Sequence, residues 1–195
     1  MIEDQSFIVK VQKRVAEGSI GLSTLRGQGS GIADTVRRFL IKIELSKLAK
    51  MDSKQFMTWL NQETKTLANR LPKVESKRNW GAARKSINIF LENAFYNRFL
   101  FNEYSLHKLE SFLELPFDSN SVSGLKKDLD KRKHRVLPKW DSIKYLKEED
   151  HKECQNIANE VVKKKFISSK HKSRIYLDLY YWRKKRGLIK KLIIE

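Results

Sequence analysis

The 195-residue sequence contains a single cysteine, Cys154, and only four histidines, which are scattered along the chain. One cysteine excludes an internal disulfide, and it excludes a zinc or iron–sulfur site built from several thiolates. The histidines show neither HxxxH nor HExxH spacing, so we expect no metal site and no cofactor. Absence of disulfides suits a reducing compartment, and we therefore expect a cytoplasmic location.

Proline and glycine are also scarce, with three and eight copies respectively, and few segments alternate apolar with polar residues. This pattern predicts an all-α protein. We expect a single helical domain over 1–195, with lobes 1–71 and 72–195 and a cleft between them. Apolar residues at helical spacing predict helices over about 5–17, 32–47, 53–71, 81–100, 105–113, 119–131, 147–165 and 173–186. Asp52, followed by Gln55, is typical of a capping box.

The sequence has no run of about 18 apolar residues, so no membrane-spanning helix is predicted. Its first residues, MIEDQSFIVK, do not form a basic segment followed by an apolar one, as a signal peptide would. The 41 basic residues outnumber the 23 acidic ones and give a net charge of +18. Such an excess indicates a polyanionic partner. Nucleic acid is favoured over an anionic membrane, because acidic residues interrupt the basic stretches.

Basic clusters fall near the expected ends of several helices, where backbone amides can help to hold phosphates. The residues that we expect to contact DNA are Arg26, Gln28, Lys77, Arg78, Arg84, Lys126, Lys127, Arg132, Lys133 and Arg186. Arg26 and Gln28 belong to the glycine-rich stretch STLRGQGSG. That stretch lacks the GxxxxGK[ST] pattern, so we do not expect a nucleoside-triphosphate site there.

Lys85 falls on the first turn of the helix expected from Gly81, away from its apolar stripe. A lysine in such a position is most often a solvated surface residue. Alternatively, the positive end of the helix and the neighbouring Arg84 and Arg78 favour the neutral amine, which can act as a nucleophile. A neutral amine can attack the C1′ atom of a sugar and form a Schiff base.

Two aspartates are candidates for chemistry. Asp118 follows Pro116 at the start of an expected helix, where it would act as an N-cap. The same fixed, ionised carboxylate can stabilise a developing oxocarbenium ion, so capping and catalysis are compatible. Asp178 lies within the apolar run RIYLDLYYW, where a carboxylate is costly to bury unless it is paired. It is either a structural acid or part of the nucleic-acid site.

Aromatic residues are interleaved with the basic clusters, and an extruded base needs flat apolar walls on which to stack. The aromatic candidates for a base pocket are Trp80, Trp140, Tyr181 and Trp182, and we add Asp178 to the pocket. Each of these rings has an alternative role in the hydrophobic core.

Three short motifs together resemble the helix-hairpin-helix DNA glycosylases. Lys85-Ser86-Ile87 is similar to the lysine motif that supplies the nucleophile in that family, and PFDSNSV is similar to the segment of its catalytic aspartate. LDLYYW, with Arg186 one turn later, resembles the late LDxxLW helix. The match covers roughly 71–186, and the lysine-to-aspartate spacing is similar to that of the archaeal 8-oxoguanine glycosylases. LPKVESKRNWG lacks the glycine pair of the family's hairpin.

The resemblance implies a monomeric DNA N-glycosylase that binds duplex DNA containing a modified or damaged base. The base would swing out into the cleft between two lobes. Asp118 would stabilise positive charge at C1′, and Lys85 would displace the base through a Schiff base that permits strand cleavage. If Asp118 acts in catalysis but Lys85 does not, the enzyme would be monofunctional: it would release the base and leave an intact abasic strand.

Three other interpretations remain open. An enzyme with the same chemistry could remove hypermodified bases from invading phage DNA rather than repair the host's own DNA. A basic helical protein could bind nucleic acid without catalysis, since this requires only the charged surface. The chain could also be a subunit of a larger nucleoprotein assembly, docked through its tail, LIKKLIIE.

Overall fold

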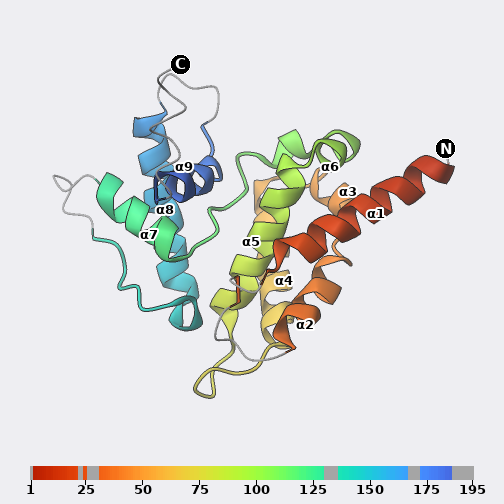
Figure 1. Cartoon of the computed structure of the whole chain (residues 1–195). Coiled ribbons are helices and arrows are strands. Elements are labelled where there is room, and N and C mark those ends of the chain that lie inside the picture. Colours follow the sequence, from red (N-terminus) through yellow and green to blue (C-terminus); the bar gives the residue numbers. More distant parts are fainter. Residues whose placement is uncertain (1, 22–23, 26–30, 130–135, 167–171, 186–195) are drawn as a thin grey trace. The chain divides into compact units, whose positions relative to one another are not determined.

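The computed structural model describes residues 2–21, 24–25, 31–129, 136–166 and 172–185 (Figure 1). Within these segments the protein is all-helical, as the sequence predicted, and the only β-type pairing is an isolated bridge between Val74 and Lys77. No helix in these segments is long and apolar enough to cross a membrane.

The chain forms two compact units, Met1–Phe112 and Leu113–Glu195. The boundary differs from the lobes 1–71 and 72–195 considered above. Helix α5 (Trp80–Tyr96) explains the difference, because it packs against α1 (Ile2–Ser19) and α4 (Ser53–Ala68). Residues after 72 therefore complete the first unit.

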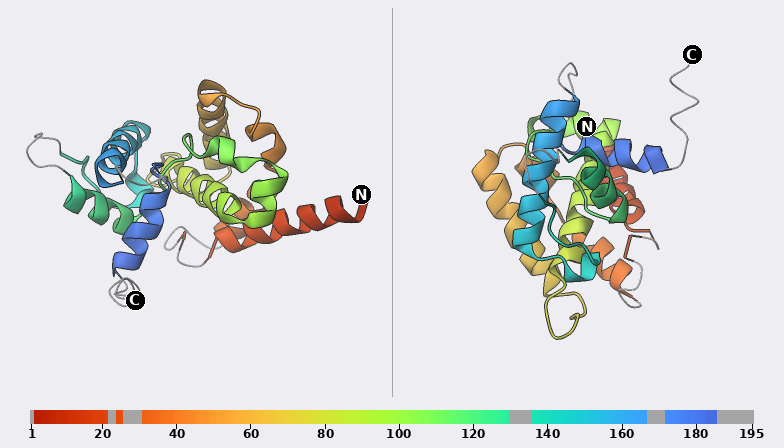
Figure 2. Two further views of the ribbon diagram at one scale, coloured as in Figure 1. Left: turned by 90° about the horizontal axis from the view of Figure 1, so that it is seen from above. Right: turned by 90° about the vertical axis from the view of Figure 1, so that its left-hand side faces the viewer.

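Unit 1 also contains α2 (Ile32–Leu40), α3 (Leu45–Leu48), α6 (Arg98–Glu103) and the 3-10 turn η1 (Leu106–Leu109). Helix α5 is its central helix and contacts α1, α2, α4 and α6 (Figures 1 and 2). The apolar residues that α5 buries include Ala82, Ala83, Ile87, Phe90, Leu91 and Ala94. Three alanines on this helix permit close approach of its neighbours, while the larger side chains fill the remaining space.

Local capping chemistry explains where several helices begin. Asp52 and Gln55 form the predicted capping box: Asp52 Oδ1 accepts from the Gln55 amide at 2.8 Å, and Gln55 Oε1 accepts from the Asp52 amide at 3.0 Å. The helix expected over 81–100 is interrupted at Asn97, whose side chain accepts from the amides of Phe99 and Leu100. Asn97 thus starts α6 instead of continuing α5.

The connection between α4 and α5 is a short hairpin. Val74 and Lys77 exchange two backbone hydrogen bonds of 2.9 Å, and the two residues between them, Glu75 and Ser76, both have positive φ. This is the geometry of a two-residue primed turn. It leaves Lys77 and Arg78 exposed.

Unit 2 contains α7 (Ser119–Asp128), the turn η3 (Ile143–Tyr145), α8 (Glu148–Lys165) and α9 (Tyr176–Lys185). Helix α7 packs against both α8 and α9. The side chain of Gln155 on α8 bonds both backbone groups of Leu115, at 3.1 and 2.8 Å, and so fixes the segment that leads into α7. Next to it, His151 Nε2 lies 3.4 Å from Glu114 Oε2, with both side chains buried.

Burial raises the pKa of the Cys154 thiol from 9.0 to about 11, with smaller contributions from the charges of Asp150 and Glu153. Folding therefore favours the neutral thiol, and this contribution to stability is present below pH 9 and is lost as the pH rises towards 11. The stability advantage of wild type over Cys154→Ala should shrink across this window, as measured by thermal unfolding at pH 8, 9, 10 and 11. An advantage that stays constant with pH would contradict this assignment.

Candidate nucleic-acid interface

Lys85 lies in the second turn of α5, because the helix begins at Trp80. The sequence placed it in the first turn, where the field of the helix end is strongest. Its side chain is half-buried rather than solvated. The contribution of the helix end to its chemistry is therefore smaller than the sequence predicted.

Arg84 is only 2% exposed and is built into the core of unit 1. Its Nη1 atom donates to Asn61 Oδ1 at 2.9 Å and to Thr64 Oγ1 at 3.0 Å, both on α4. The guanidinium also lies over the ring of Trp80, 5.5 Å from its centroid. Our prediction that Arg84 contacts DNA is therefore corrected, because this side chain joins α5 to α4.

Arg84→Met should lower the free energy of unfolding by about 1–3 kcal/mol, because it removes hydrogen bonds to two polar groups in the core. Its affinity for DNA should be unchanged when measured well below its melting temperature. Arg78→Met is the matched control, since Arg78 is exposed. Thermal unfolding and fluorescence anisotropy with a labelled duplex measure the two quantities. If Arg84→Met had normal stability but bound DNA more weakly, the original prediction that Arg84 contacts DNA would be supported instead.

Asp118 is the N-cap of α7, as predicted. Its Oδ1 atom accepts from the amides of Asn120 at 2.7 Å and Ser121 at 3.0 Å, while Ser121 Oγ accepts from the Asp118 amide. The carboxylate is half-buried and held in one orientation. Lys85 belongs to unit 1 and Asp118 to unit 2, so neither unit alone contains both predicted catalytic groups.

The residues expected to form a base pocket are also divided between the units. Trp80 is half-buried at the start of α5 in unit 1, whereas the others belong to unit 2. Tyr181 is 4% exposed in the core of unit 2, and Trp140 packs against the same core. Their rings stabilise unit 2, and the Tyr181 ring is occupied by packing against α7. Asp178 is half-buried, and the side chain of Trp182 lies outside what the structure describes.

Four of the predicted DNA contacts are exposed on the described surface: Lys77 and Arg78 beside the hairpin of unit 1, and Lys126 and Lys127 in the last turn of α7. The other predicted contacts lie outside the described residues; they are Arg26, Gln28, Arg132, Lys133 and Arg186.

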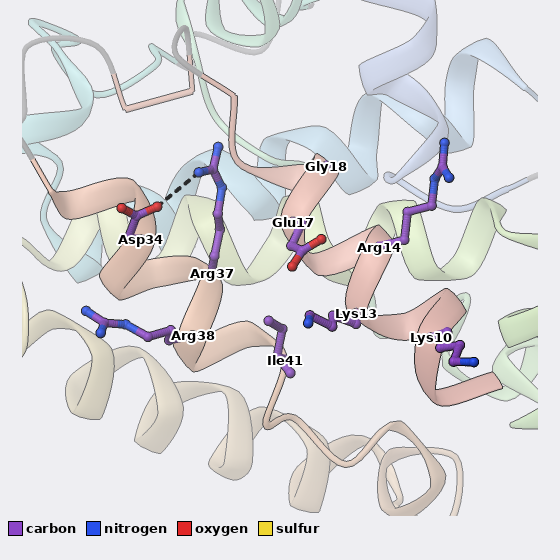
Figure 3. A pocket seen from close by; sticks show the side chains of 9 residues that line it. All are labelled: Lys10, Lys13, Arg14, Glu17, Gly18, Asp34, Arg37, Arg38 and Ile41. Carbon is purple, nitrogen blue, oxygen red and sulfur yellow. Dashed lines mark hydrogen bonds and ion pairs between the residues drawn. The ribbon is translucent and has the colours of Figure 1, made fainter. Parts of the chain in front are cut away.

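A basic groove between α1 and α2, not identified from the sequence, has the strongest concentration of charge seen in a described cavity (Figure 3). Its volume is about 1090 Å³. The cations that line it are Lys10, Lys13, Arg14, Arg37 and Arg38. All of these cations except the half-buried Arg37 are exposed, so they remain available to a ligand.

Two carboxylates, Glu17 and Asp34, also line the basic groove. Asp34 is engaged by Arg37 at 3.1 Å, and Arg37 Nη2 also donates to the Ile20 carbonyl at 2.6 Å (Figure 3). Arg37 thus ties α2 to the end of α1. The remaining cations leave the groove with a positive field, which attracts anions.

The signal for the basic groove was present in the sequence. Lys10, Lys13 and Arg14 are three and four residues apart, which places them on one face of a helix. The packing of α1 beside α2, however, is a long-range contact that helical periodicity in the sequence does not predict.

No metal site accompanies the basic groove: across the described segments, His, Cys, Asp and Glu do not gather into any group of three or more that could hold a metal ion. Comparisons of the chain with protein-family models, with curated proteins and with solved structures find no match.

Proposed function

We propose that this chain is a DNA-binding protein whose unit 1 holds the phosphate backbone in the basic groove. The single observation that carries the proposal is the set of five cations around an open groove with two carboxylates. Lysine and arginine bind phosphates without reading bases, so the groove would position DNA rather than select a sequence.

The hairpin offers a second contact in the same unit. Lys73, Lys77 and Arg78 are exposed around its turn, and the hairpin and α2 lie at the same end of unit 1 (Figures 1 and 2). A DNA segment held in the groove could reach these side chains as well. The net charge of +18 supports the same partner.

Fluorescence anisotropy with a labelled duplex, measured over a series of salt concentrations, tests the proposal. Each phosphate neutralised contributes about −0.9 to the slope of log affinity against log salt. Three to five groove contacts therefore predict a slope between about −3 and −4.5. Absence of binding in low salt, or a slope near zero, would reject the proposal.

A second candidate function is that of a DNA N-glycosylase acting on a modified or damaged base. It is favoured by the orientation of Asp118, whose carboxylate is held by two backbone amides. In this proposal the glycosidic bond breaks, the base leaves with its electron pair, and Asp118 stabilises the positive charge at C1′ until water adds there. Lys85 is the predicted nucleophile of the alternative Schiff-base route, in which a neutral amine instead of water bonds to C1′.

Asp118→Asn separates this chemistry from helix capping. Asparagine caps a helix about as well as aspartate, so the stability of unit 2 should change little. Loss of the carboxylate should slow base release by about 100-fold or more, the scale seen when one group that stabilises transition-state charge is removed. Release of free base from a panel of damaged duplexes and modified phage DNAs is measured by mass spectrometry.

Asp52→Asn is the matched control, because Asp52 forms the other capping box. Lys85→Ala distinguishes the Schiff-base route from a monofunctional one. If a damaged duplex is the most reactive substrate, the result indicates repair of host DNA. If a modified phage DNA is the most reactive, it indicates defence against phage. Tight binding without base release from any substrate would reject the glycosylase and leave the binding function.

A further inference from the structure

A second pocket lies in unit 1, between α4 and the chain from the end of α2 to Met51. Its volume is about 430 Å³, which is within the range typical of small-molecule sites. It adjoins the basic groove along the chain: Arg38 and Ile41 line the groove, whereas Phe39 and Lys42 line the pocket. The end of α2 therefore contributes to both.

The walls of this pocket suit a flat aromatic group. Trp59 lines it and is half-buried, whereas Phe39, which also lines it, is only 5% exposed. The guanidinium of Arg70 lies over the Phe39 ring, 5.1 Å from its centroid. Aromatic rings and arginine planes are the surfaces on which unstacked bases pack.

Glu63 is one of the charged residues that line the pocket. Its carboxylate is half-buried, and it accepts no hydrogen bond and forms no ion pair with any described residue. Partial burial raises the pKa of this carboxyl, and the nearby charge of Arg70 opposes the rise. A carboxylate in such a place is stabilised by a ligand that brings N–H donors.

We propose that this pocket binds a single unstacked guanine. The proposal rests on the proposed function, since the guanine would belong to a nucleic acid whose phosphates lie in the basic groove. An ionised carboxylate has only acceptors, and guanine presents two adjacent donors, N1–H and the N2 amino group. Adenine and cytosine place an acceptor beside a donor on the same edge, which an ionised carboxylate repels.

Isothermal titration calorimetry of the full chain with GMP, AMP, CMP and UMP tests this specificity. The affinity for GMP should be at least about tenfold higher than for each of the other three nucleotides. Glu63→Gln should lower the affinity for GMP about tenfold. Glu44→Gln is the control, because Glu44 lines the same pocket but is exposed and paired with Lys47 at 2.8 Å. Trp59→Leu should weaken all four nucleotides, since it removes the stacking surface.

Equal affinity for the four nucleotides, or an unchanged affinity of Glu63→Gln for GMP, would overturn the guanine assignment. Thermal unfolding confirms that each variant is folded. Duplex binding is measured separately, so the two proposals can fail independently: duplex binding without preference for GMP rejects only the guanine site. Preference for GMP without duplex binding rejects the proposed function and the nucleic-acid context, and leaves a guanine mononucleotide site.

Discussion

Lys13→Glu combined with Arg38→Glu, which reverses both charges, should weaken duplex binding about 50-fold or more in 0.1 M salt. Each phosphate contact contributes nearly tenfold at this salt concentration through counterion release, and two contacts would be lost. The slope of log affinity against log salt should become less steep by about 2. Both residues line the basic groove and are exposed, so the substitutions should leave the fold intact.

The matched control is Lys54→Glu with Lys65→Glu on α4, which changes the net charge by the same amount. Both lysines are exposed, and neither lines a described pocket. This control separates a local contact from the general attraction of a basic protein. If both double variants lose the same affinity, the groove has no special role in binding DNA.

Gly124→Ala should lower the stability of unit 2 by about 1–3 kcal/mol, the usual effect of overpacking a core. A Cβ atom at position 124 would lie 2.2 Å from Tyr181 Cδ1 and 2.3 Å from Tyr181 Cγ. These ring atoms are near the backbone of α9, and the side chain is buried, so the ring has little freedom to move away. Helices α7 and α9 would have to separate, and calorimetry would show a lower melting temperature for unit 2.

Gly18→Ala is the control for this substitution, since Gly18 is also helical and, apart from its chain neighbours and its own helix backbone, nothing lies within 4 Å of its added Cβ. It should be neutral or stabilising by up to about 1 kcal/mol, because alanine favours helix more than glycine. Gly124→Ala combined with Tyr181→Ala should lose less stability than the sum of the two single variants. Wild-type stability in Gly124→Ala would show that α7 and α9 do not pack as described.

Local chemistry made part of this fold predictable from the sequence. Asp52 with Gln55, and Asp118 before α7, were identified correctly because a helix cap depends on residues only two or three positions apart. Scarce proline and glycine likewise predicted the helical class. The interruption at Asn97 was missed, because apolar spacing continues across it while its side chain caps the next helix.

Long-range packing accounts for most of the remaining differences. In the sequence, Arg84 belongs to a basic cluster, which suggests an exposed side chain. Its burial becomes visible only in the structure, where it donates hydrogen bonds to Asn61 and Thr64 on another helix. The sequence around Gly124 likewise gives no sign that Tyr181, far along the chain, packs against it. These contacts join residues at least 20 positions apart, and a local sequence pattern does not contain such a relation.

The basic groove is tested most directly by lysine acetylation of the full chain, with and without a saturating duplex, read by mass spectrometry. The predicted result is that Lys10 and Lys13 lose reactivity when DNA is bound, while Lys54 and Lys65 on α4 stay reactive. Unchanged reactivity of Lys10 and Lys13, with protection of lysines elsewhere such as Lys126 and Lys127, would contradict the groove as the site of DNA binding.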